Sequence, residues 1–217
     1  DGPAGSGKSS TAKRVAAQLG FVHLDTGAMY RAVTLKSLRE GIAADDKQGL
    51  RDLMNRTEIS FSGSPPHTQT WLDGEDVSDA IRGDDVTRSV SDYCQPAVVR
   101  SALVEQQRAV GSKQNCVCEG RDIGTVVFPD AELKFFMVAS VTERARRRQR
   151  DFAALGLKKS LDELVADIET RDRKDSQREL SPLRKADNAV ELDTTDMSLD
   201  EQVTYVVDKA REKALAG

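Results

Sequence analysis

The stretch Gly2-Pro3-Ala4-Gly5-Ser6-Gly7-Lys8-Ser9, close to the start of the chain, decides the fold class. It fits the pattern G-x-x-x-x-G-K-[ST] at every fixed position. Glycines let the backbone bend so that successive N–H groups point at phosphate oxygens, and a helix that starts near Gly7 adds the positive end of its dipole. Lys8 can reach the β- and γ-phosphates, and the Ser9 hydroxyl can bind Mg²⁺. The motif predicts that the residues from Gly2 to Ser10 bind a nucleoside triphosphate.

The sequence around this loop alternates between strand and helix patterns. Val15, Ala16 and Leu19 form one apolar stripe, and Gly20 ends the expected helix. Short apolar runs bounded by turn residues then recur along the chain, at Phe21–Leu24, Cys116–Cys118, Leu133–Val138 and Ala189–Leu192. Strands separated by helices predict an α/β fold with a parallel sheet flanked by helices.

Two capping boxes and one β segment refine this prediction. Ser160-Leu161-Asp162-Glu163 and Ser198-Leu199-Asp200-Glu201 each place a glutamate three residues after a serine, which predicts a helix start. Between Thr57 and Val77 the apolar pattern has period two, with turns at Pro65-Pro66 and Asp73-Gly74. We expect a small inserted β subdomain there; the alternative is an irregular surface loop.

Composition excludes several protein classes. The chain has 217 residues, of which 38% are hydrophobic and 31% charged, and its mean hydropathy is −0.51. No apolar run approaches the roughly 18 residues of a membrane-spanning helix, and the start lacks the pattern of a signal peptide. An odd number of cysteines argues against a disulfide framework, so we interpret Cys116 and Cys118 as reduced, buried strand residues. A soluble, cytoplasmic protein without a membrane partner is expected.

The charge is unevenly distributed along the chain. The net charge is −4, which argues against a general nucleic-acid-binding protein. Residues 143–187 nevertheless hold 13 of the 32 Lys and Arg against 10 Asp and Glu, a local net charge of +3. Such an enrichment of arginine in an acidic chain suits a small polyanionic ligand, although a solvated helix face gives the same pattern.

Three further segments carry candidate ligand-binding side chains. They are Leu24–Arg31 (L-D-T-G-A-M-Y-R), Cys118–Thr125 (C-E-G-R-D-I-G-T) and Arg171–Arg178 (R-D-R-K-D-S-Q-R). Each follows an expected strand or lies on a helix directed toward the strand ends, where open α/β sheets bind ligands. The spacing of Arg171, Asp175 and Arg178 places them on one face of a helix. Together with Arg31 and Arg121 these arginines favour a second, phosphate-bearing substrate, although any single one could form a surface salt bridge.

The sequence resembles the bacterial cytidylate kinases, a group of nucleoside monophosphate kinases, over essentially its whole length. The most specific elements are D-T-G-A-M-Y-R, the stretch G-R-D-I-G-T-V-V-F-P at Gly120–Pro129, R-D-x-x-D-S-x-R, and the β insert, which adenylate kinases lack. The resemblance implies one P-loop kinase domain over residues 1–217, with a core of about 1–25, 91–145 and 159–217. It also implies a monophosphate-binding region at 26–90, with the insert at about 57–77, and a lid at 146–158.

The resemblance also implies roles for individual residues. Thr26 and Arg31 resemble positions that hold the acceptor phosphate, and Arg121 and Arg178 resemble further phosphate contacts. Arg171 and Asp175 resemble the pair near the sugar. The implied cytosine contacts are Ser91, Arg100 and Asp122, and the implied lid arginine at ATP is Arg147. Glu119 stands where the family often has aspartate, which keeps the charge.

The expected reaction transfers the γ-phosphate of ATP to CMP, and to dCMP, with Mg²⁺ as cofactor, in pyrimidine nucleotide metabolism. The acceptor phosphate is mostly dianionic near pH 7, since its second pKa is about 6, so no general base is needed. Catalysis then depends on charge neutralisation by Lys8, Arg121, Arg171 and Arg178. We expect a monomer. The alternatives are a UMP or shikimate-type kinase and a nucleotide-dependent switch, for which a guanine-reading N-K-x-D stretch is absent.

Overall fold

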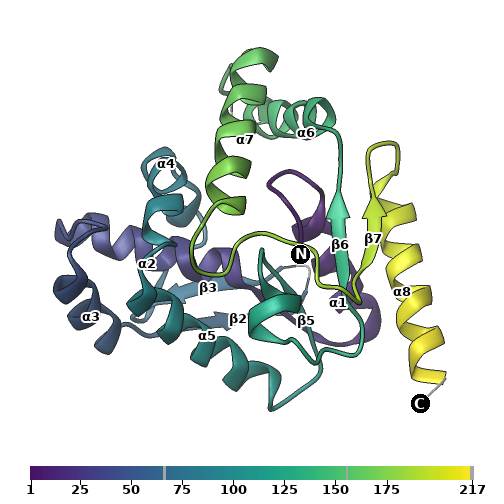
Figure 1. The fold of residues 1–217 in the computed structure, drawn as a ribbon, viewed down its shortest axis with the longest axis horizontal. Coiled ribbons are helices and arrows are strands. Elements are labelled where there is room, and N and C mark those ends of the chain that lie inside the picture. The colour runs from purple at the N-terminus through teal and green to yellow at the C-terminus, as the bar shows by residue number, and fades with distance from the viewer. Residues whose placement is uncertain (66, 155, 216–217) are drawn as a thin grey trace. The chain divides into compact units, whose positions relative to one another are not determined.

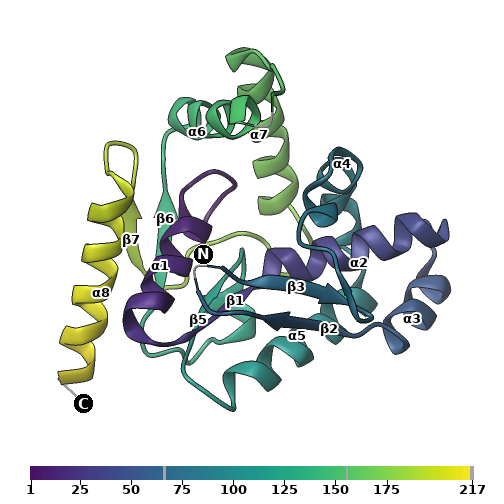
Figure 2. The same ribbon diagram turned by 180° about the vertical axis from the view of Figure 1, so that it is seen from behind.

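The computed structural model describes residues 1–65, 67–154 and 156–215, so Pro66 of the expected turn and residue 155 of the expected lid lie outside the described residues. The chain forms two compact units (Figures 1 and 2). One consists of Asp1–Val15 and Gly120–Gly217, and the other of Ala16–Glu119. Both combine parallel strands with helices, and the predicted α/β class of a P-loop NTPase is confirmed.

In the first unit, β6 (Phe135–Val138) pairs in parallel with β7 (Val190–Asp193), with Phe135 opposite Val190 and Val138 opposite Asp193. The N–H of Met137 donates to the carbonyl of Asp1 (2.8 Å), so the segment that precedes the phosphate loop lies along β6. The helices associated with this unit are α1 (Lys8–Leu19), the π-helical turn η2 (Ile123–Val127), α6 (Val141–Ala154), α7 (Leu161–Ser176) and α8 (Leu199–Leu215).

Both predicted capping boxes are present. The Ser160 hydroxyl accepts the N–H of Glu163 (3.2 Å), and the Glu163 carboxylate accepts the N–H of Ser160 (2.9 Å). Ser198 and Glu201 make the same reciprocal pair at 3.3 and 2.8 Å. Each box satisfies backbone N–H groups that a helix start leaves unpaired. The helices α7 and α8 therefore begin one residue after their capping serines.

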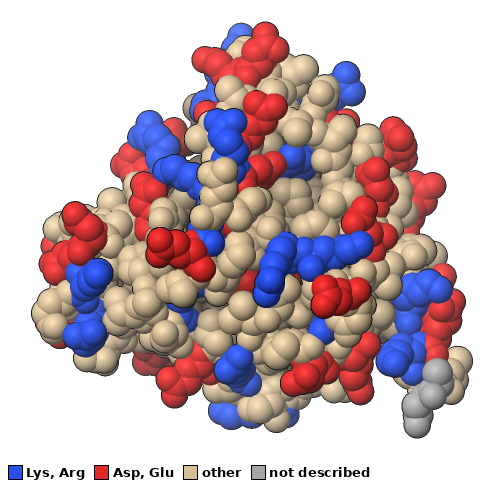
Figure 3. Space-filling model, viewed as in Figure 1, with Lys and Arg blue, Asp and Glu red and all other residues tan. Residues whose placement is uncertain are grey.

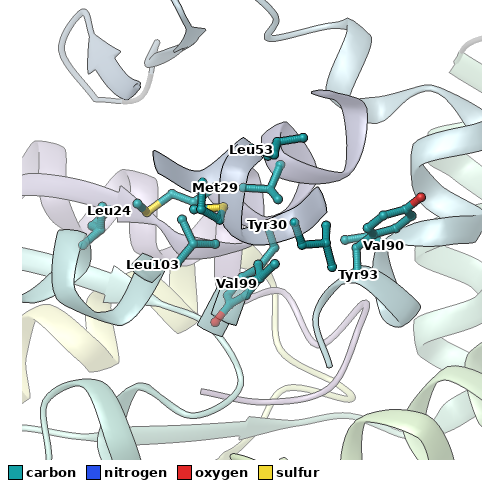
Figure 4. Packing of buried hydrophobic residues seen from close by; sticks show 11 residues of the cluster. Leu24, Met29, Tyr30, Leu53, Val90, Tyr93, Val99 and Leu103 are labelled. Carbon is teal, nitrogen blue, oxygen red and sulfur yellow. The ribbon is translucent and has the colours of Figure 1, made fainter. Parts of the chain in front are cut away.

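In the second unit, β1 (Val22–Asp25) pairs in parallel with β5 (Cys116–Glu119). Four α-helices and a 3₁₀ turn belong to this unit: α2 (Thr26–Glu40), α3 (Lys47–Asn55), η1 (Ala80–Arg82), α4 (Asp84–Tyr93) and α5 (Ala97–Gly111). Its main core joins side chains from β1 and from all four helices, as Figure 4 shows for Leu24, Met29, Tyr30, Leu53, Val90, Tyr93, Val99 and Leu103.

The predicted β insert is a three-stranded antiparallel sheet (Figure 2). Its strands are β2 (Ile59–Ser62), β3 (Gln69–Leu72) and β4 (Glu75–Asp76). Asp73 and Gly74 both have positive φ (51° and 85°), the geometry that a tight hairpin requires. Leu72 packs with Val77, Ile81 and two alanines of α2, so the insert shares a small core with that helix. The alternative of an irregular loop is therefore wrong.

The cysteines differ in part from expectation. All three are free thiols, as predicted, but Cys116 and Cys118 are half-buried and not fully buried. Cys118 packs against the edge of the main core of its unit, and burial raises the pKa of its thiol. Within the described residues, none of the helices combines the length and the apolar character that a membrane crossing needs.

Candidate active site

The phosphate loop has the backbone that its glycines predict. Gly2, Gly5 and Gly7 have φ values of 149°, 78° and 91°. A Cβ at Gly2 would lie 2.1 Å from the carbonyl oxygen of Met137 in β6, so a larger residue cannot be accommodated there without moving backbone. Helix α1 begins at Lys8, directly after the loop. The N–H groups of its first turn and the positive end of its dipole therefore lie next to the loop, which suits an anion.

The side chain of Lys8 folds back over its own loop. Its Nζ donates to the carbonyl of Pro3 (3.0 Å), and the residue is 8% exposed. The Ser6 hydroxyl donates to the same carbonyl (3.0 Å). Ser9 and Ser10 lie exposed in the first turn of α1. The predicted triphosphate-binding residues thus form one continuous loop and helix start.

Arg147, the predicted lid arginine, lies against this loop from α6. Its Nε donates to Glu143 (3.2 Å), and its Nη1 donates to the hydroxyl of Thr194 (3.1 Å) and to the carbonyl of Gly5 (3.4 Å). Thr194 in turn donates to the carbonyl of Ser6 (2.9 Å). The guanidinium is therefore held beside the phosphate loop, and its contact with ATP stays a prediction.

The sequence interpretation missed Arg144. This side chain is 4% exposed, and its guanidinium donates to the carbonyls of Ala4 and Ala139 (3.1 Å each) and pairs with Asp172 (2.7 Å). A Cβ at Gly5 would lie 3.0 Å from the Arg144 Cβ. Arg144 therefore joins the phosphate loop to α6 and α7. Its only sequence signal was membership of an arginine-rich run, which is also typical of a solvated helix.

Asp175 is the centre of an arginine cluster in the first unit. Its carboxylate accepts Nε of Arg121 (2.9 Å), and both side chains are largely buried. Burial by itself would raise the pKa of Asp175, but the charges of Arg121, Arg171 and Arg178 hold the pKa below its ordinary value. One anionic charge among these cations leaves an excess of positive charge, which favours binding of an anion.

Arg178 reaches this cluster by a different route from the one predicted. Helix α7 ends at Ser176, so the expectation that Arg171, Asp175 and Arg178 share one helical face is wrong for Arg178. The chain instead turns back, and the N–H of Leu183 donates to the carbonyl of Asp175 (2.8 Å). Within the described part of the chain, Nε and Nη2 of Arg178 are buried and have no hydrogen-bond acceptor. Buried donors of this kind are suited to a ligand oxygen.

Asp122, a predicted cytosine contact, is 4% exposed and precedes η2. The backbone immediately after it is fixed by Asp1, whose carboxylate accepts the N–H groups of Ile123 (2.9 Å) and Gly124 (2.8 Å). Asp1 therefore ties the start of the phosphate loop to the segment that carries Arg121 and Asp122. This contact was not predicted, because nothing local in the sequence pairs these two segments.

In the second unit, Thr26 and Arg31 both lie on α2. The Thr26 hydroxyl is buried and donates to the carbonyl of Glu119 at the end of β5 (2.7 Å). Nη1 of Arg31 donates to the carbonyl of Ile81 (3.0 Å) and to the hydroxyl of Thr87 (2.9 Å). The two predicted phosphate-binding residues are thus one and a half helical turns apart on one element.

Arg100 contacts the same helix. It is 4% exposed, it donates to the carbonyl of Cys94 (3.1 Å), and its guanidinium lies 5.3 Å from the ring centroid of Tyr30. A cation over an aromatic face at this distance is attractive and fixes the guanidinium. Ser91 is half-buried on α4. Arg100 is therefore anchored on Tyr30, the residue that precedes Arg31 in α2.

A pair of carboxylates at the ends of β1 and β5 was not predicted as a site. Asp25 lies opposite Glu119 in the strand register, and Glu119 contacts Nε2 of His23 (3.1 Å). Burial raises the pKa of Asp25, and the charge of Glu119 raises it further. Asp25 also accepts the N–H of Ala28 (2.9 Å), so it caps α2. Sequence reasoning missed the pair because strand register cannot be read from either segment alone.

Comparisons with known proteins agree with this geometry. The family model described as cytidylate kinase matches residues 1–212. The chain is 46% identical to a cytidylate kinase of Geobacillus kaustophilus over 213 residues, which cover 98% of this chain and 95% of that protein. It is 44% identical to a cytidylate kinase of Halalkalibacterium halodurans over 213 residues, covering 98% of this chain and 96% of the relative.

A third relative is longer. A bifunctional pantoate ligase/cytidylate kinase of a Synechococcus strain is 51% identical over 210 residues, which cover 95% of this chain but 39% of that protein. The chain thus spans nearly the full length of the two relatives with a single named activity and well under half of the bifunctional one. By the family model and the full-length relatives, the chain belongs to the cytidylate kinase family and transfers a phosphoryl group from ATP to CMP, as the sequence predicted.

Proposed function

We propose that Lys8, Arg121, Arg171 and Arg178 stabilise the charge on the phosphoryl group during its transfer to CMP. The observation that carries this proposal is the cluster around Asp175. Three arginines lower the pKa of this one carboxyl group, and Nε and Nη2 of Arg178 are buried donors without an acceptor in the described chain. Preorganised cations in a partly desolvated place stabilise developing negative charge strongly.

The reaction needs positioning more than proton transfer. The CMP phosphate is mostly dianionic near neutral pH, so its oxygen attacks without a general base. The residues from Gly2 to Ser10, with Arg147, bind ATP in this proposal. Thr26 and Arg31 hold the acceptor phosphate, Arg171 and Asp175 lie at the sugar, and Ser91, Arg100 and Asp122 read the cytosine. An aspartate oxygen accepts from the exocyclic amine of cytosine, where uracil presents a carbonyl oxygen.

Magnesium fits the first turn of α1. The Ser9 hydroxyl is exposed there, and the described residues contain no cluster of three or more histidine, cysteine or acidic side chains that would make a cage for a metal. Mg²⁺ keeps several water ligands and binds through few protein oxygens together with substrate phosphates, so one hydroxyl suits it. When bound, Mg²⁺ neutralises charge on the β- and γ-phosphates.

The remaining proposals concern the whole protein. Residues 26–90 form the monophosphate-binding region and residues 146–158 the lid of one kinase domain. We expect both CMP and dCMP as acceptors, and a cytoplasmic monomer without nucleic-acid or membrane partners. The absence of a nucleic-acid partner is supported in part by Figure 3, in which Lys and Arg are interspersed with Asp and Glu on the face in view.

The test is ADP production by the purified protein with a panel of acceptors. We expect turnover with CMP and dCMP, much less with UMP, and none with shikimate or without an acceptor. The Lys8→Ala variant serves as the control for contaminating kinases, because it removes the cation from the phosphate loop and should abolish turnover. ADP production that does not depend on an acceptor would contradict the proposed roles of the arginines.

A further inference from the structure

The guanidinium of Arg31 is fixed by two acceptors from outside its own helix. Nη1 carries two N–H bonds, and the structure provides two acceptors for them: the carbonyl of Ile81 at 3.0 Å and the hydroxyl of Thr87 at 2.9 Å. A planar guanidinium held at two points through one nitrogen has its plane and direction set. The direction of the rest of the guanidinium therefore depends on where Ile81 and Thr87 lie.

Both acceptors are themselves held in place. Ile81 is 1% exposed and packs with Ala28 and Ala32 of α2, the helix that carries Arg31. Thr87 lies in the first turns of α4, between the buried Val86 and the exposed Arg88. Its N–H donates to the carbonyl of Gly83 (2.9 Å), as a helical residue's should. The Ile81 contact uses a backbone carbonyl, whereas the Thr87 contact depends on one side-chain oxygen, which a substitution can remove.

The Thr87 hydroxyl contributes little to its own helix. Its bond to the carbonyl of Arg82 is long, at 3.4 Å, and the N-cap residue of α4 is Gly83, which has no side chain to make a cap. The 2.9 Å contact with Arg31 is the shorter one, and it involves a charged donor. Hydrogen bonds to charged groups are stronger than neutral ones. The geometry therefore favours a role of this hydroxyl in holding Arg31.

We propose that Thr87 is a positioning residue, which orients Arg31 toward the phosphate of CMP without touching the substrate itself. This inference rests on the proposed role of Arg31 as a phosphate contact. Loss of the hydroxyl would remove the Thr87 contact of Nη1, which is one of the two that fix this end of the guanidinium, and would widen the range of its orientations. Ordering that side chain again on binding costs free energy. CMP should therefore bind more weakly, while ATP is unaffected.

The test compares Thr87→Val, which keeps the branched shape and removes the hydroxyl, with Thr87→Ser, which keeps the hydroxyl. We expect Thr87→Val to raise the KM for CMP by about three- to tenfold, the scale of one ordinary hydrogen bond, because the variant loses orientation of Arg31 and not the Arg31 contact itself. The KM for ATP should not change, and Thr87→Ser should behave like the unaltered protein. Arg88→Ala is the matched control, because Arg88 is exposed on the same helix and pairs with Asp85, three residues away.

Binding of cytidine separates positioning from a general defect. Cytidine lacks the phosphate, so Thr87→Val should weaken binding of CMP and leave binding of cytidine unchanged. An equal loss for both ligands would identify Thr87 as structural and overturn the inference. If Thr87→Val folds poorly, Thr87→Ala replaces it, and the same ratio of CMP affinity to cytidine affinity is measured.

A double-mutant cycle with Arg31→Met distinguishes the role of Arg31 as a phosphate contact from the role of Thr87 in positioning it. If Arg31→Met leaves the KM for CMP unchanged, the proposed role of Arg31 is wrong. If Arg31→Met raises the KM but Thr87→Val does not, only the inference about Thr87 is wrong. We expect both variants to raise it, and Thr87→Val to add little in the Arg31→Met background.

Discussion

Two carboxyl groups in this protein have pKa values displaced in opposite directions. Burial favours the neutral form of both. At Asp175 the surrounding arginines outweigh burial and lower the pKa, so the carboxylate stays ionised well below neutral pH. At Asp25 the neighbouring Glu119 adds to burial and raises the pKa, and the hydrogen bond from the Ala28 N–H, with the charges of His23 and Arg82, offsets only part of the effect. The sign of the local charge, and not burial alone, decides the ionisation of each group.

The raised pKa of Asp25 predicts that Asp25→Asn stabilises the protein at neutral pH. The folded protein binds the Asp25 proton more tightly than the unfolded chain does, so this group lowers stability increasingly as the pH rises above its unfolded pKa, and fully above its folded pKa. Asparagine removes that cost and still caps α2. We expect the free energy of unfolding to rise on the order of 1 kcal/mol at pH 7, a usual size for single substitutions. Urea unfolding across a range of pH measures it.

The pH dependence provides the internal check on this prediction. The gain should shrink as the pH falls through the folded pKa of Asp25, because the aspartate is then neutral too. Asp46→Asn is the matched control, since Asp46 also caps a helix in the same unit, at the exposed start of α3. A gain for Asp25→Asn that persists unchanged at low pH would show that charge repulsion is not its cause.

Asp122 should decide between cytosine and uracil. If its carboxylate accepts the cytosine amine, Asp122→Asn presents a donor as well as an acceptor and tolerates the uracil carbonyl. The ratio of kcat/KM for CMP to that for UMP should then fall by about 1–3 kcal/mol, the scale of one good base contact. Arg100→Met is the comparison, because its guanidinium donates to ring acceptors that the two bases partly share, so both substrates should weaken. Equal slowing of CMP and UMP by Asp122→Asn would instead mean that Asp122 serves only to orient Arg121.

At the level of elements, the phosphate loop is held by neighbours as well as by its own glycines. Arg144 on α6 donates to the carbonyl of Ala4, and Thr194 after β7 donates to the carbonyl of Ser6. Thr11 on α1 donates to Gln202 on α8 (2.8 Å). These contacts satisfy loop and helix groups that would otherwise be left buried without partners. The loop is therefore preorganised before any nucleotide binds.

Helix α7 carries Arg171 and Asp175, and its start depends on the Ser160 capping box. Ser160→Ala removes the side-chain acceptor for the N–H of Glu163 and should lower the free energy of unfolding by about 1 kcal/mol. The change should appear in urea unfolding, while kcat stays close to that of the unaltered protein because the arginine cluster lies at the other end of the helix. Ser112→Ala is a suitable control, since the Ser112 hydroxyl donates to the carbonyl of Ala109 at an exposed helix end. A loss of activity without a loss of stability would contradict this account.

The sequence predicted the parts of the fold that depend on local signals. The phosphate loop, both capping boxes, the strands and the β insert are all encoded within short segments, and all are present. Contacts between distant segments could not be predicted in this way. Arg178 lies near Asp175 because the chain turns back after α7, and Asp25 lies opposite Glu119 because of the register of β1 and β5. Arg144 could not be distinguished from its arginine neighbours until the fold showed which one is buried.

At the scale of the whole molecule, the positive and negative side chains largely offset one another in number. The net charge is −4, and positive and negative side chains are intermixed on the face shown in Figure 3. The arginine-rich stretch 143–187 does not translate into a general basic surface, because several of its members pair with carboxylates, such as Arg144 with Asp172 and Arg147 with Glu143. The excess positive charge then lies in local clusters, such as the arginines around Asp175, which suit a small phosphate-bearing ligand better than a polymer.

Two segments of the chain should close over the substrates when these bind. A kinase has to exclude water from ATP, and loops that cover the substrates commonly do this. We expect backbone hydrogen exchange to slow in residues 26–90 and 146–158 when a bisubstrate analogue binds. At an analogue concentration of about 100 times its Kd, openings that require its release should become about a hundredfold rarer. Helix α8 is the internal reference, since its exposed outer face carries none of the proposed binding residues. Protection that is confined to the phosphate loop, with both segments exchanging as in the free protein, would mean that they bind substrate without closing over it.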